Sequence, residues 1–482
     1  MNEYKLFVQR IGLFGVTNIL VSLSSLILLP FLTQNLTTQD YAIWTIFIVT
    51  VGIIPLIVTL GLPYSMVRFL AIKTETKDIK EEFYSITLLL LFVGLITSII
   101  LLLLSKQIAL ILFKGNTVIS TLLALTTLAS IIYISFSGFF RTFQHMKIVS
   151  ILSLIQTYLM VAIVVFLLES GYKIEGAIFG YFIAQFIVAL VSIWLVLRQI
   201  GFKFPKFKSI GKYLSFGMPT IPGNLSSWIV DASDRYLILF ILGTIFVGYY
   251  TPAYTLGIVI TMFAAPFSFI LPALLSRYYD QNEIGEVKKH LDYSIKYFML
   301  LAIPAVFGLS FLSKPLLLLI THKPELALNG YFITPFVALG ALLVGLYGII
   351  VQIMVLEKKT KIIGSQWMAA AALNVILNII FIPRFGIIAA AIATLTAYLF
   401  TLVITLIYSQ KYIKIEFDLK FLLKSLAASV LMSSIILFIN PVSAIGILAT
   451  ILICSVVYIV IIFILKGISR EEIEFFKELG HI

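Results

Sequence analysis

The chain has 482 residues, of which 61% are hydrophobic and only 12% are charged, with a formal net charge of +12. This composition excludes a soluble globular protein, because a water-facing surface of that size needs many more charged side chains. The Lys and Arg residues lie in short segments between apolar runs, so lipid headgroups and topology account for the basic balance, and no nucleic-acid partner is expected.

Apolar runs long enough to cross a bilayer follow one another along the whole chain. About 20 apolar residues in a helix span the hydrocarbon core. The first run follows Lys5 and Arg10 and has no small-residue cleavage pattern after it, which favours a membrane helix over a secretory signal peptide. The predicted spans lie near residues 11–32, 41–67, 84–104, 117–140, 148–168, 176–197, 213–242, 247–275, 294–312, 329–355, 365–382, 386–408, 420–438 and 444–465.

The loops between these spans predict their orientation. With the N-terminus in the cytoplasm, the cytoplasmic segments carry 27 of the 34 Lys and Arg residues and the outer loops carry 6, while Arg235 lies within a span. Such an alternating excess follows the positive-inside rule. The sequence therefore predicts an all-α integral membrane protein of about 14 transmembrane helices, in the cell membrane, with both termini in the cytoplasm.

An internal repeat divides the predicted spans. Its matches have offsets of 208 to 213 residues, which correspond to six helices, so both copies cross the membrane in the same direction. The matching segments are Pro63 to Arg68 with Pro272 to Arg277, Ser105-Lys106 with Ser313-Lys314, and Gly176, Gly180 and Ala184 with Ala389, Ala393 and Ala397. We expect an N-terminal lobe at 1–212, a C-terminal lobe at 213–410, and two additional helices with a tail at 411–482. Parallel repeats in membranes typically enclose a cavity and work by alternating access, which predicts a transporter.

Three charged residues lie within the seventh predicted span: Asp231, Asp234 and Arg235. A charge near the centre of a membrane helix costs about 2.5–3.5 kcal/mol, so these side chains need a partner or a wet cavity. Asp231 and Arg235 are four residues apart and can form a structural ion pair. The alternative is a substrate site, in which Arg235 contacts an anionic group and an aspartate titrates or binds a cation.

Further candidate substrate-binding residues are arginines at helix ends and asparagines within spans. Arg68 and Arg277 recur at matching repeat positions, where they either anchor a helix to lipid headgroups or bind phosphate, which suits the planar guanidinium. Asn224, Asn374 and Asn378 are either interhelical hydrogen-bonding groups or part of the site. The sequence has no Walker loop, dinucleotide-type glycine cluster or metal-spaced His/Cys group, so no cofactor, metal or catalytic residue is expected.

Several of these segments together resemble a known family. They are Gly61-Leu-Pro63 before Arg68, Gly217-Met-Pro219, Asp231-Ala-Ser-Asp234-Arg235, Val247-Gly248-Tyr249-Tyr250, and Leu373-Asn374 to Asn378 leading to Ile382-Pro383-Arg384-Phe385-Gly386. With the six, six and two arrangement of helices, they resemble the polysaccharide transporters, or Wzx-type O-antigen and capsule flippases, of the multidrug/oligosaccharidyl-lipid/polysaccharide exporter superfamily.

The resemblance implies a flippase for a polyprenyl-(di)phosphate-linked oligosaccharide, moved from the inner to the outer leaflet for cell-surface polysaccharide biosynthesis. It implies an ion gradient or the membrane potential as energy source, with membrane lipids, a polysaccharide polymerase and chain-length machinery as partners. One alternative is a multidrug or small-molecule exporter of the same superfamily, which the net positive charge of the five candidate Arg and Asp residues disfavours. The other is a polysaccharide polymerase, which the short outer loops disfavour.

Overall fold

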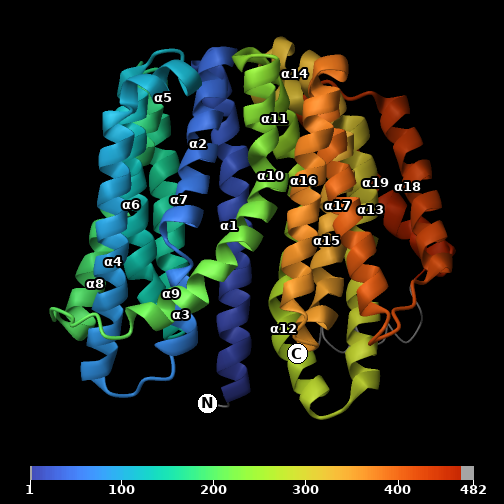
Figure 1. The fold of residues 1–482 in the computed structure, drawn as a ribbon. Helices are drawn as coiled ribbons and strands as arrows, with labels where there is room; N and C mark the ends of the chain where they lie inside the picture. Colours follow the sequence, from blue (N-terminus) through green and yellow to red (C-terminus); the bar gives the residue numbers. More distant parts are fainter. Residues whose placement is uncertain (1–2, 468–482) are drawn as a thin grey trace. The chain divides into compact units, whose positions relative to one another are not determined.

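The structure is a computed structural model that describes residues 3–467, with side chains from residue 15 onward. Every regular element in that range is helical (Figure 1). Two features used to predict the orientation, the side chains of Lys5 and Arg10 and the tail after residue 467, lie outside the described residues. The chain forms two compact units: Met1–Thr251 with Trp367–Gly386 (unit 1), and Pro252–Gln366 with Ile387–Ile482 (unit 2). Lobes bounded at residues 212 and 410, as the repeat suggests, remain a proposal.

Unit 1 holds the first helices of the chain and two helix portions from later in the sequence. Its complete elements are α1 (Glu3–Asn35), α2 (Thr38–Val58), α3 (Leu62–Phe69), α4 (Thr76–Leu103), α5 (Ser105–Leu112), α6 (Thr117–Thr142), α7 (Met146–Glu169), α8 (Ile174–Ile200), α9 (Ile210–Gly217), η1 (Met218–Thr220) and α10 (Ile221–Ile241). It also takes most of α11 (Thr244–Gly257) and of α16 (Thr360–Phe385).

Unit 2 contains the remaining helices. They are η2 (Ile258–Phe263), α12 (Ala265–Asp280), α13 (Ile284–Thr321), α14 (Pro324–Gly330), η3 (Tyr331–Ile333), α15 (Thr334–Leu356), α17 (Ile387–Ser409), α18 (Leu419–Ile439) and α19 (Ala444–Ile464). Its last two helices pack on α13 through a buried cluster that includes Leu312, Met432 and Cys454. Cys454 is buried there as a small apolar side chain, as is typical of a lone membrane cysteine.

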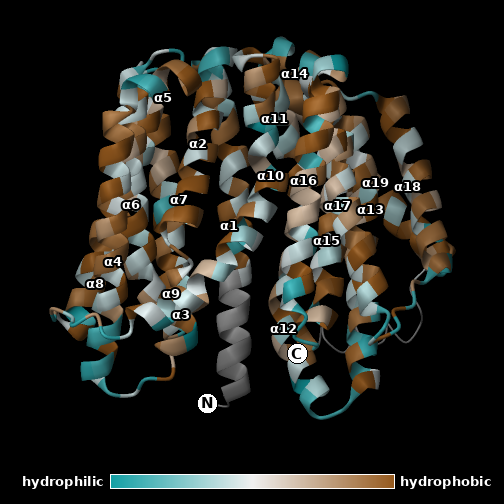
Figure 2. Ribbon diagram, in the orientation of Figure 1, coloured by the Kyte–Doolittle hydropathy of each residue, from teal (hydrophilic) through white to brown (hydrophobic). Residues whose placement is uncertain are grey.

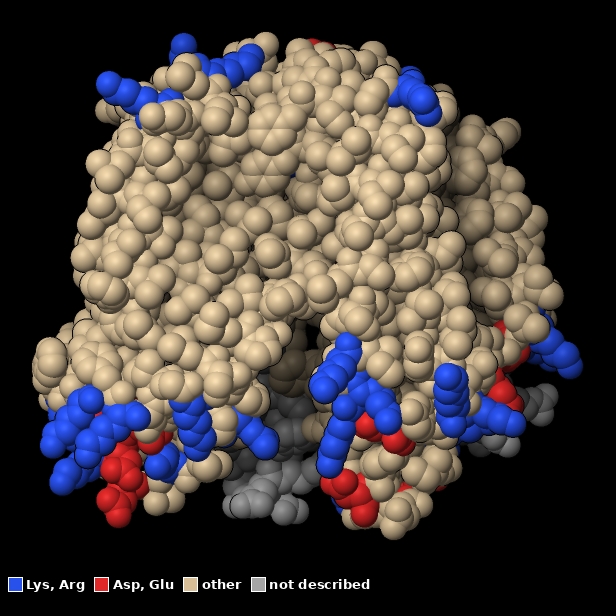
Figure 3. Space-filling view, viewed as in Figure 1, with Lys and Arg blue, Asp and Glu red and all other residues tan. Residues whose placement is uncertain are grey.

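The prediction of a multi-pass helical membrane protein is confirmed. Among the described residues, thirteen helical segments are long and apolar enough to cross a membrane. The one predicted span outside that set is the seventh, which contains α10, because α10 has three charged residues near its centre. Figure 2 shows the apolar character along the long helices, and Figure 3 shows charged side chains at the helix ends of each unit, leaving an apolar band between them.

Short polar motifs explain where several helices begin. Thr37 caps α2 by accepting a hydrogen bond from the Asp40 amide at 3.1 Å, and Asp418 caps α18 through the Phe421 amide at 2.9 Å. Ser443 caps α19 in the same way. Each cap satisfies one of the backbone N–H groups that the first turn of a helix leaves without a helical partner.

The second and the seventh predicted spans are each interrupted, and the two interruptions cross each other in unit 1. The second span breaks before α3 at Gly61, which has a φ of 65°, and the seventh breaks between α9 and α10, near Pro219 and Pro222. A Cβ atom at Gly61 would lie 2.1 Å from the Gly217 carbonyl oxygen. Only glycines permit this approach, so the Gly61–Gly217 crossing sets the position of α9 and, through it, the start of α10.

The segment before α9 is also fastened to unit 1. Glu81 of α4 forms an ion pair with Lys203 at 3.4 Å and accepts a hydrogen bond from the Lys206 amide. Glu82 accepts a hydrogen bond from the Tyr213 hydroxyl, and the Tyr213 carbonyl accepts one from Ser65 of α3 at 2.7 Å. These contacts hold both ends of the connection between α8 and α9.

Candidate functional site

The helix α10 carries the charged residues of the candidate site. The predicted span of residues 213–242 is interrupted by a 3-10 turn at residues 218–220, and the regular helix α10 covers Ile221–Ile241. Asp231 therefore lies at the middle of α10. Asp234 and Arg235 follow within about 6 Å along the helix axis, at the 1.5 Å rise per residue of an α-helix.

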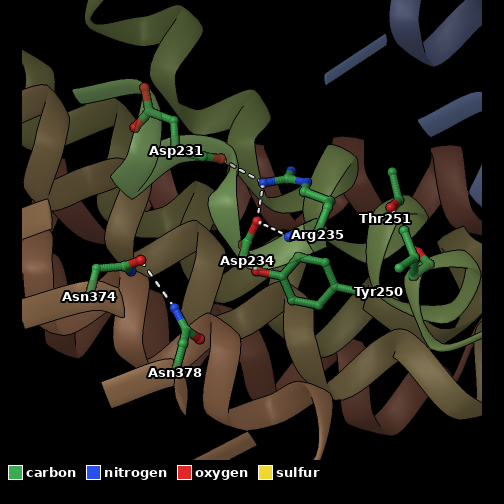
Figure 4. A network of polar contacts seen from close by, with 8 residues as sticks. Asp231, Asp234, Arg235, Tyr250, Thr251, Asn374 and Asn378 are labelled. Carbon is green, nitrogen blue, oxygen red and sulfur yellow. Dashed lines mark hydrogen bonds and ion pairs between the residues drawn. The ribbon is translucent and has the colours of Figure 1, made fainter. Parts of the chain in front are cut away.

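Asp234 and Arg235 form a buried ion pair. The Arg235 Nη1 atom lies 2.7 Å from Asp234 Oδ1, and the Arg235 backbone N–H donates to the same oxygen at 2.8 Å (Figure 4). Asp234 is 0% exposed and Arg235 is 7% exposed. Such burial strengthens the attraction between the two charges, and removing either one would leave the other uncompensated.

Tyr250 of α11 completes the group. Its hydroxyl donates to Asp234 Oδ2 at 2.5 Å, and its ring lies under the Arg235 guanidinium, with 5.6 Å between the guanidinium carbon and the ring centroid. Gly248 brings α11 close to the start of α2, since a Cβ atom there would lie 2.6 Å from the Thr38 carbonyl oxygen. Asp234 is thus held from two helices, and Arg235 has an aromatic face on one side.

The partner predicted for Arg235 needs correction. The spacing of four residues predicts an ion pair with Asp231, but the carboxylate at 2.7 Å from the guanidinium is that of Asp234. Asp231 instead contributes its backbone carbonyl oxygen, 2.5 Å from Arg235 Nη1, and its side chain is exposed. Asp234 therefore forms the structural ion pair with Arg235, while Asp231 provides an exposed carboxylate at the middle of the same helix.

Asn374 and Asn378 of α16 form a second polar group in unit 1. The Asn378 amide donates to Asn374 Oδ1 at 3.0 Å, and both side chains are 0% exposed. The prediction that they share one helix face is confirmed. The side-chain amide oxygen of Asn378, Oδ1, is buried and has no hydrogen-bond partner among the described residues. Such an atom is unfavourable in a low-dielectric interior unless a ligand or water reaches it.

The remaining predicted residues lie near helix ends. Arg68 is exposed in the last turn of α3, and Arg277 is exposed in the last turn of α12 in unit 2. Each short helix follows a break in its span, so the repeat match corresponds to matching local structure. Asn224, near the start of α10, accepts a hydrogen bond from the Tyr64 hydroxyl at 3.4 Å. Helix-end arginines also balance the helix dipole, so a substrate role for Arg68 and Arg277 stays a prediction.

Tyr250 is the residue of this group that the sequence analysis did not select. It lies in the quoted Val247–Tyr250 motif, but a tyrosine in a membrane helix is common, and 16 residues separate it from Asp234. Only the packing of α11 against α10 brings Tyr250 to Asp234. A weak signal existed in the adjacent Gly248, because a glycine in an apolar helix often marks a close helix approach.

The Tyr250→Phe variant is expected to lose about 1–3 kcal/mol of stability, because Asp234 would keep its burial and lose a donor. The measurement is the thermal unfolding midpoint of the purified protein in lipid nanodiscs. Tyr172→Phe is the control, since Tyr172 is 61% exposed. Equal midpoints for the two variants would show that the Tyr250 hydroxyl does not support Asp234.

Comparisons with known proteins place the chain in a family. Residues 7–276, more than half of the chain, match the sequence model of the family described as "Polysaccharide biosynthesis protein". Over 233 residues the chain is 24% identical to the "Probable low-salt glycan biosynthesis flippase Agl15" of Haloferax volcanii, an alignment that covers 48% of each protein. The chain thus spans about half the length of this curated relative.

Solved structures share the fold. One is "Lipid II flippase MurJ, inward closed conformation", with a TM-score of 0.78 and 19% identity over 93% of this chain and 97% of that one. Another is an inward-facing multidrug resistance MATE family transporter of the MOP superfamily, with a TM-score of 0.68 and 13% identity over 82% of this chain and 94% of that one. Since these identities are low, the likeness establishes the fold alone. The family model, which matches more than half of the chain, shows that the chain belongs to the family described as "Polysaccharide biosynthesis protein".

Proposed function

We propose that the protein is a flippase that moves a polyprenyl-(di)phosphate-linked oligosaccharide from the inner to the outer leaflet by alternating access. The observation that carries this proposal is the Asp231–Asp234–Arg235 group at mid-depth of a membrane helix, in a chain of the polysaccharide biosynthesis protein family. A membrane protein keeps charges at that depth where they face a partner or a polar substrate path. The glycan flippase and lipid II flippase among its similar proteins support the same substrate class.

An apolar cavity in unit 2 supports a lipid-linked substrate. It has a volume of about 610 Å³ and lies among η2, α13, α18 and α19. Its lining is almost entirely apolar, with Leu309, Leu316, Met432 and Ile459 among the contributors. In a bilayer such a cavity holds hydrocarbon, and part of a polyprenyl chain fits its chemistry, while the polar parts of the substrate need a separate, polar path.

Filling this cavity is expected to slow transport without unfolding the protein. Gly308 of α13 lines the cavity, and a Cβ atom there meets no atom within 4 Å. Gly308→Leu is expected to reduce flipping at least about five-fold and to keep or raise stability, because glycine within a helix costs about 1 kcal/mol. The measurement is flipping of lipid-linked glycan in proteoliposomes, with Gly308→Ala as control. Full activity of the leucine variant would show that the tail does not use this cavity.

The remaining parts of the proposal follow from the same class of substrate. The protein would lie in the cell membrane with both termini in the cytoplasm, use an ion gradient or the membrane potential, and work beside a polysaccharide polymerase and chain-length machinery. Arg68 and Arg277 would meet the phosphate groups of the substrate. Asn224, Asn374, Asn378 and the exposed carboxylate of Asp231 would contact its polar portion.

The experiment is deletion of the gene in its native host, followed by measurement of lipid-linked glycan in each leaflet. The proposal predicts accumulation in the inner leaflet that the wild-type gene relieves. Normal crossing in the deletion strain would overturn it. A simultaneous gain of sensitivity to cationic drugs would then favour a multidrug exporter.

A further inference from the structure

A cavity with polar lining residues lies in unit 1 and shares none of these residues with the proposed charged site. It has a volume of about 320 Å³ and is lined by residues of α1, α7 and α8. Its lining residues include four with hydroxyl groups (Ser24, Ser153, Thr157 and Tyr181) and two glutamines, and none of its lining residues is charged. The glutamines come from the middle third of α7 and of α8, so the cavity is at membrane depth.

The two glutamines, Gln156 and Gln185, bind each other and keep unused hydrogen-bonding capacity. Gln156 Nε2 donates to Gln185 Oε1 at 2.5 Å, and Gln185 is only 3% exposed. Each amide has two donor hydrogens and an oxygen with two lone pairs, so this bond uses a small part of their capacity. Among the described residues the structure gives neither amide a second partner, although buried amides of this kind are normally saturated.

The tyrosine in the cavity is in a similar situation. The ring of Tyr181 is held edge-on by Trp44 and Phe47 of α2, at centroid distances of 6.1 and 5.9 Å. Its hydroxyl has no hydrogen-bond partner among the described side chains and backbone groups. Nearby, the Tyr158 hydroxyl donates to the Leu20 carbonyl at 3.0 Å and fastens α7 to α1 beside the cavity. Contacts with α1 and α2 thus fix parts of the cavity wall, while three polar side chains, Gln156, Gln185 and Tyr181, retain free donors and acceptors.

The composition of the lining selects the class of ligand. An ion would meet only neutral groups here and would keep its full charge inside the membrane, which costs several kcal/mol. An apolar chain would leave the amides and the hydroxyl unsatisfied. A polyhydroxyl ring satisfies both requirements, because each hydroxyl is donor and acceptor at once, and the cavity is larger than a single ordered water needs.

We propose that the cavity of Gln156, Gln185 and Tyr181 is a binding subsite for an uncharged sugar ring of the transported glycan. The subsite rests on the proposed flippase function and deepens it: the charged residues meet the phosphate end of the substrate, and the neutral cavity binds a sugar. With this subsite, the protein would discriminate between glycans through hydrogen bonds from side chains of α7 and α8 to the sugar.

The test uses the full chain in lipid nanodiscs and three probes. They are lipid-linked glycan isolated from the gene-deletion host, the oligosaccharide released from it by mild acid, and polyprenyl diphosphate without sugar. The main variant is Q156L/Q185L, which replaces both partners of the hydrogen bond by apolar groups of similar size and should keep the fold. Met160→Leu is the matched control, since Met160 lines the same cavity without a hydrogen-bonding group.

The double variant is expected to bind the released oligosaccharide and the lipid-linked glycan roughly ten-fold more weakly than wild type, which corresponds to one or two lost hydrogen bonds. Its affinity for polyprenyl diphosphate should be unchanged. Tyr181→Phe, which removes a hydroxyl that no described residue binds, should weaken glycan binding in the same direction and keep the test valid if the double variant does not fold.

Two results would overturn the subsite: the first leaves the proposed flippase function standing, and the second does not. Wild-type affinity for all three probes in both the double variant and Tyr181→Phe would show a solvent-filled cavity while leaving the flippase proposal intact. If wild type binds lipid-linked glycan no better than polyprenyl diphosphate, the protein does not recognise the glycan, and the proposed function fails together with the subsite.

Discussion

Arg235→Ala is expected to abolish transport and to destabilise the protein by about 3–5 kcal/mol. The variant leaves Asp234, which is 0% exposed, as an uncompensated buried charge. It also removes the guanidinium from the Tyr250 ring and from the Asp231 carbonyl oxygen. The measurements are flipping of lipid-linked glycan in proteoliposomes and the thermal unfolding midpoint in nanodiscs.

A second variant separates the loss of stability from the loss of function. D234N/R235Q removes both charges together, so no uncompensated charge remains and the midpoint should return close to that of wild type. The asparagine that replaces Asp234 would still accept a hydrogen bond from the Tyr250 hydroxyl, as the aspartate does. If Arg235 meets an anionic group of the substrate, this stable double variant remains inactive. Full transport by the double variant would mean that the ion pair is structural only.

Gly61→Ala is expected to destabilise unit 1 by at least about 3 kcal/mol. Two effects add: alanine is disfavoured at a φ of 65°, and its Cβ atom would overlap the Gly217 carbonyl, 2.1 Å away. Backbone atoms cannot rotate out of the way, so α3 and α9 must separate. Because α9 leads into α10, the same change should also lower transport at temperatures where the variant is still folded.

The paired glycine and a nearby glycine provide the controls. Gly217→Ala tests the overlap by itself, because Gly217 has an ordinary helical φ of −74° while its Cβ atom would lie 2.7 Å from the Leu60 carbonyl oxygen, and about 1–3 kcal/mol is expected. Gly211→Ala meets no atom within 4 Å and should be neutral or stabilising. If all three variants unfold at the wild-type midpoint, the crossing has no role in stability.

The membrane class and nearly all span positions could be predicted from composition and loop charge. Lipid offers no hydrogen bonds, so each apolar run must form a complete helix by itself, and long-range contacts have little influence on where it lies. The spans predicted to end at residues 242 and 382 and to be followed at once by the next span do divide there, at Gly243 and Gly386, both with positive φ. The break at Gly61 was not predicted, because a glycine in an apolar run indicates only a local weakness.

The sequence by itself determined that this is a polytopic helical membrane protein with charged residues in one span, because burial of charge in lipid is costly wherever the helices pack. Only the tertiary structure decided which groups satisfy those charges. A rule based on helix spacing selects Asp231 for Arg235, whereas the partner is Asp234, held by Tyr250 of the next helix. The pairing of Gln156 with Gln185 has the same origin. Hydrogen bonds between helices depend on which faces meet and how closely, and that is fixed by packing rather than by the periodicity of any one helix.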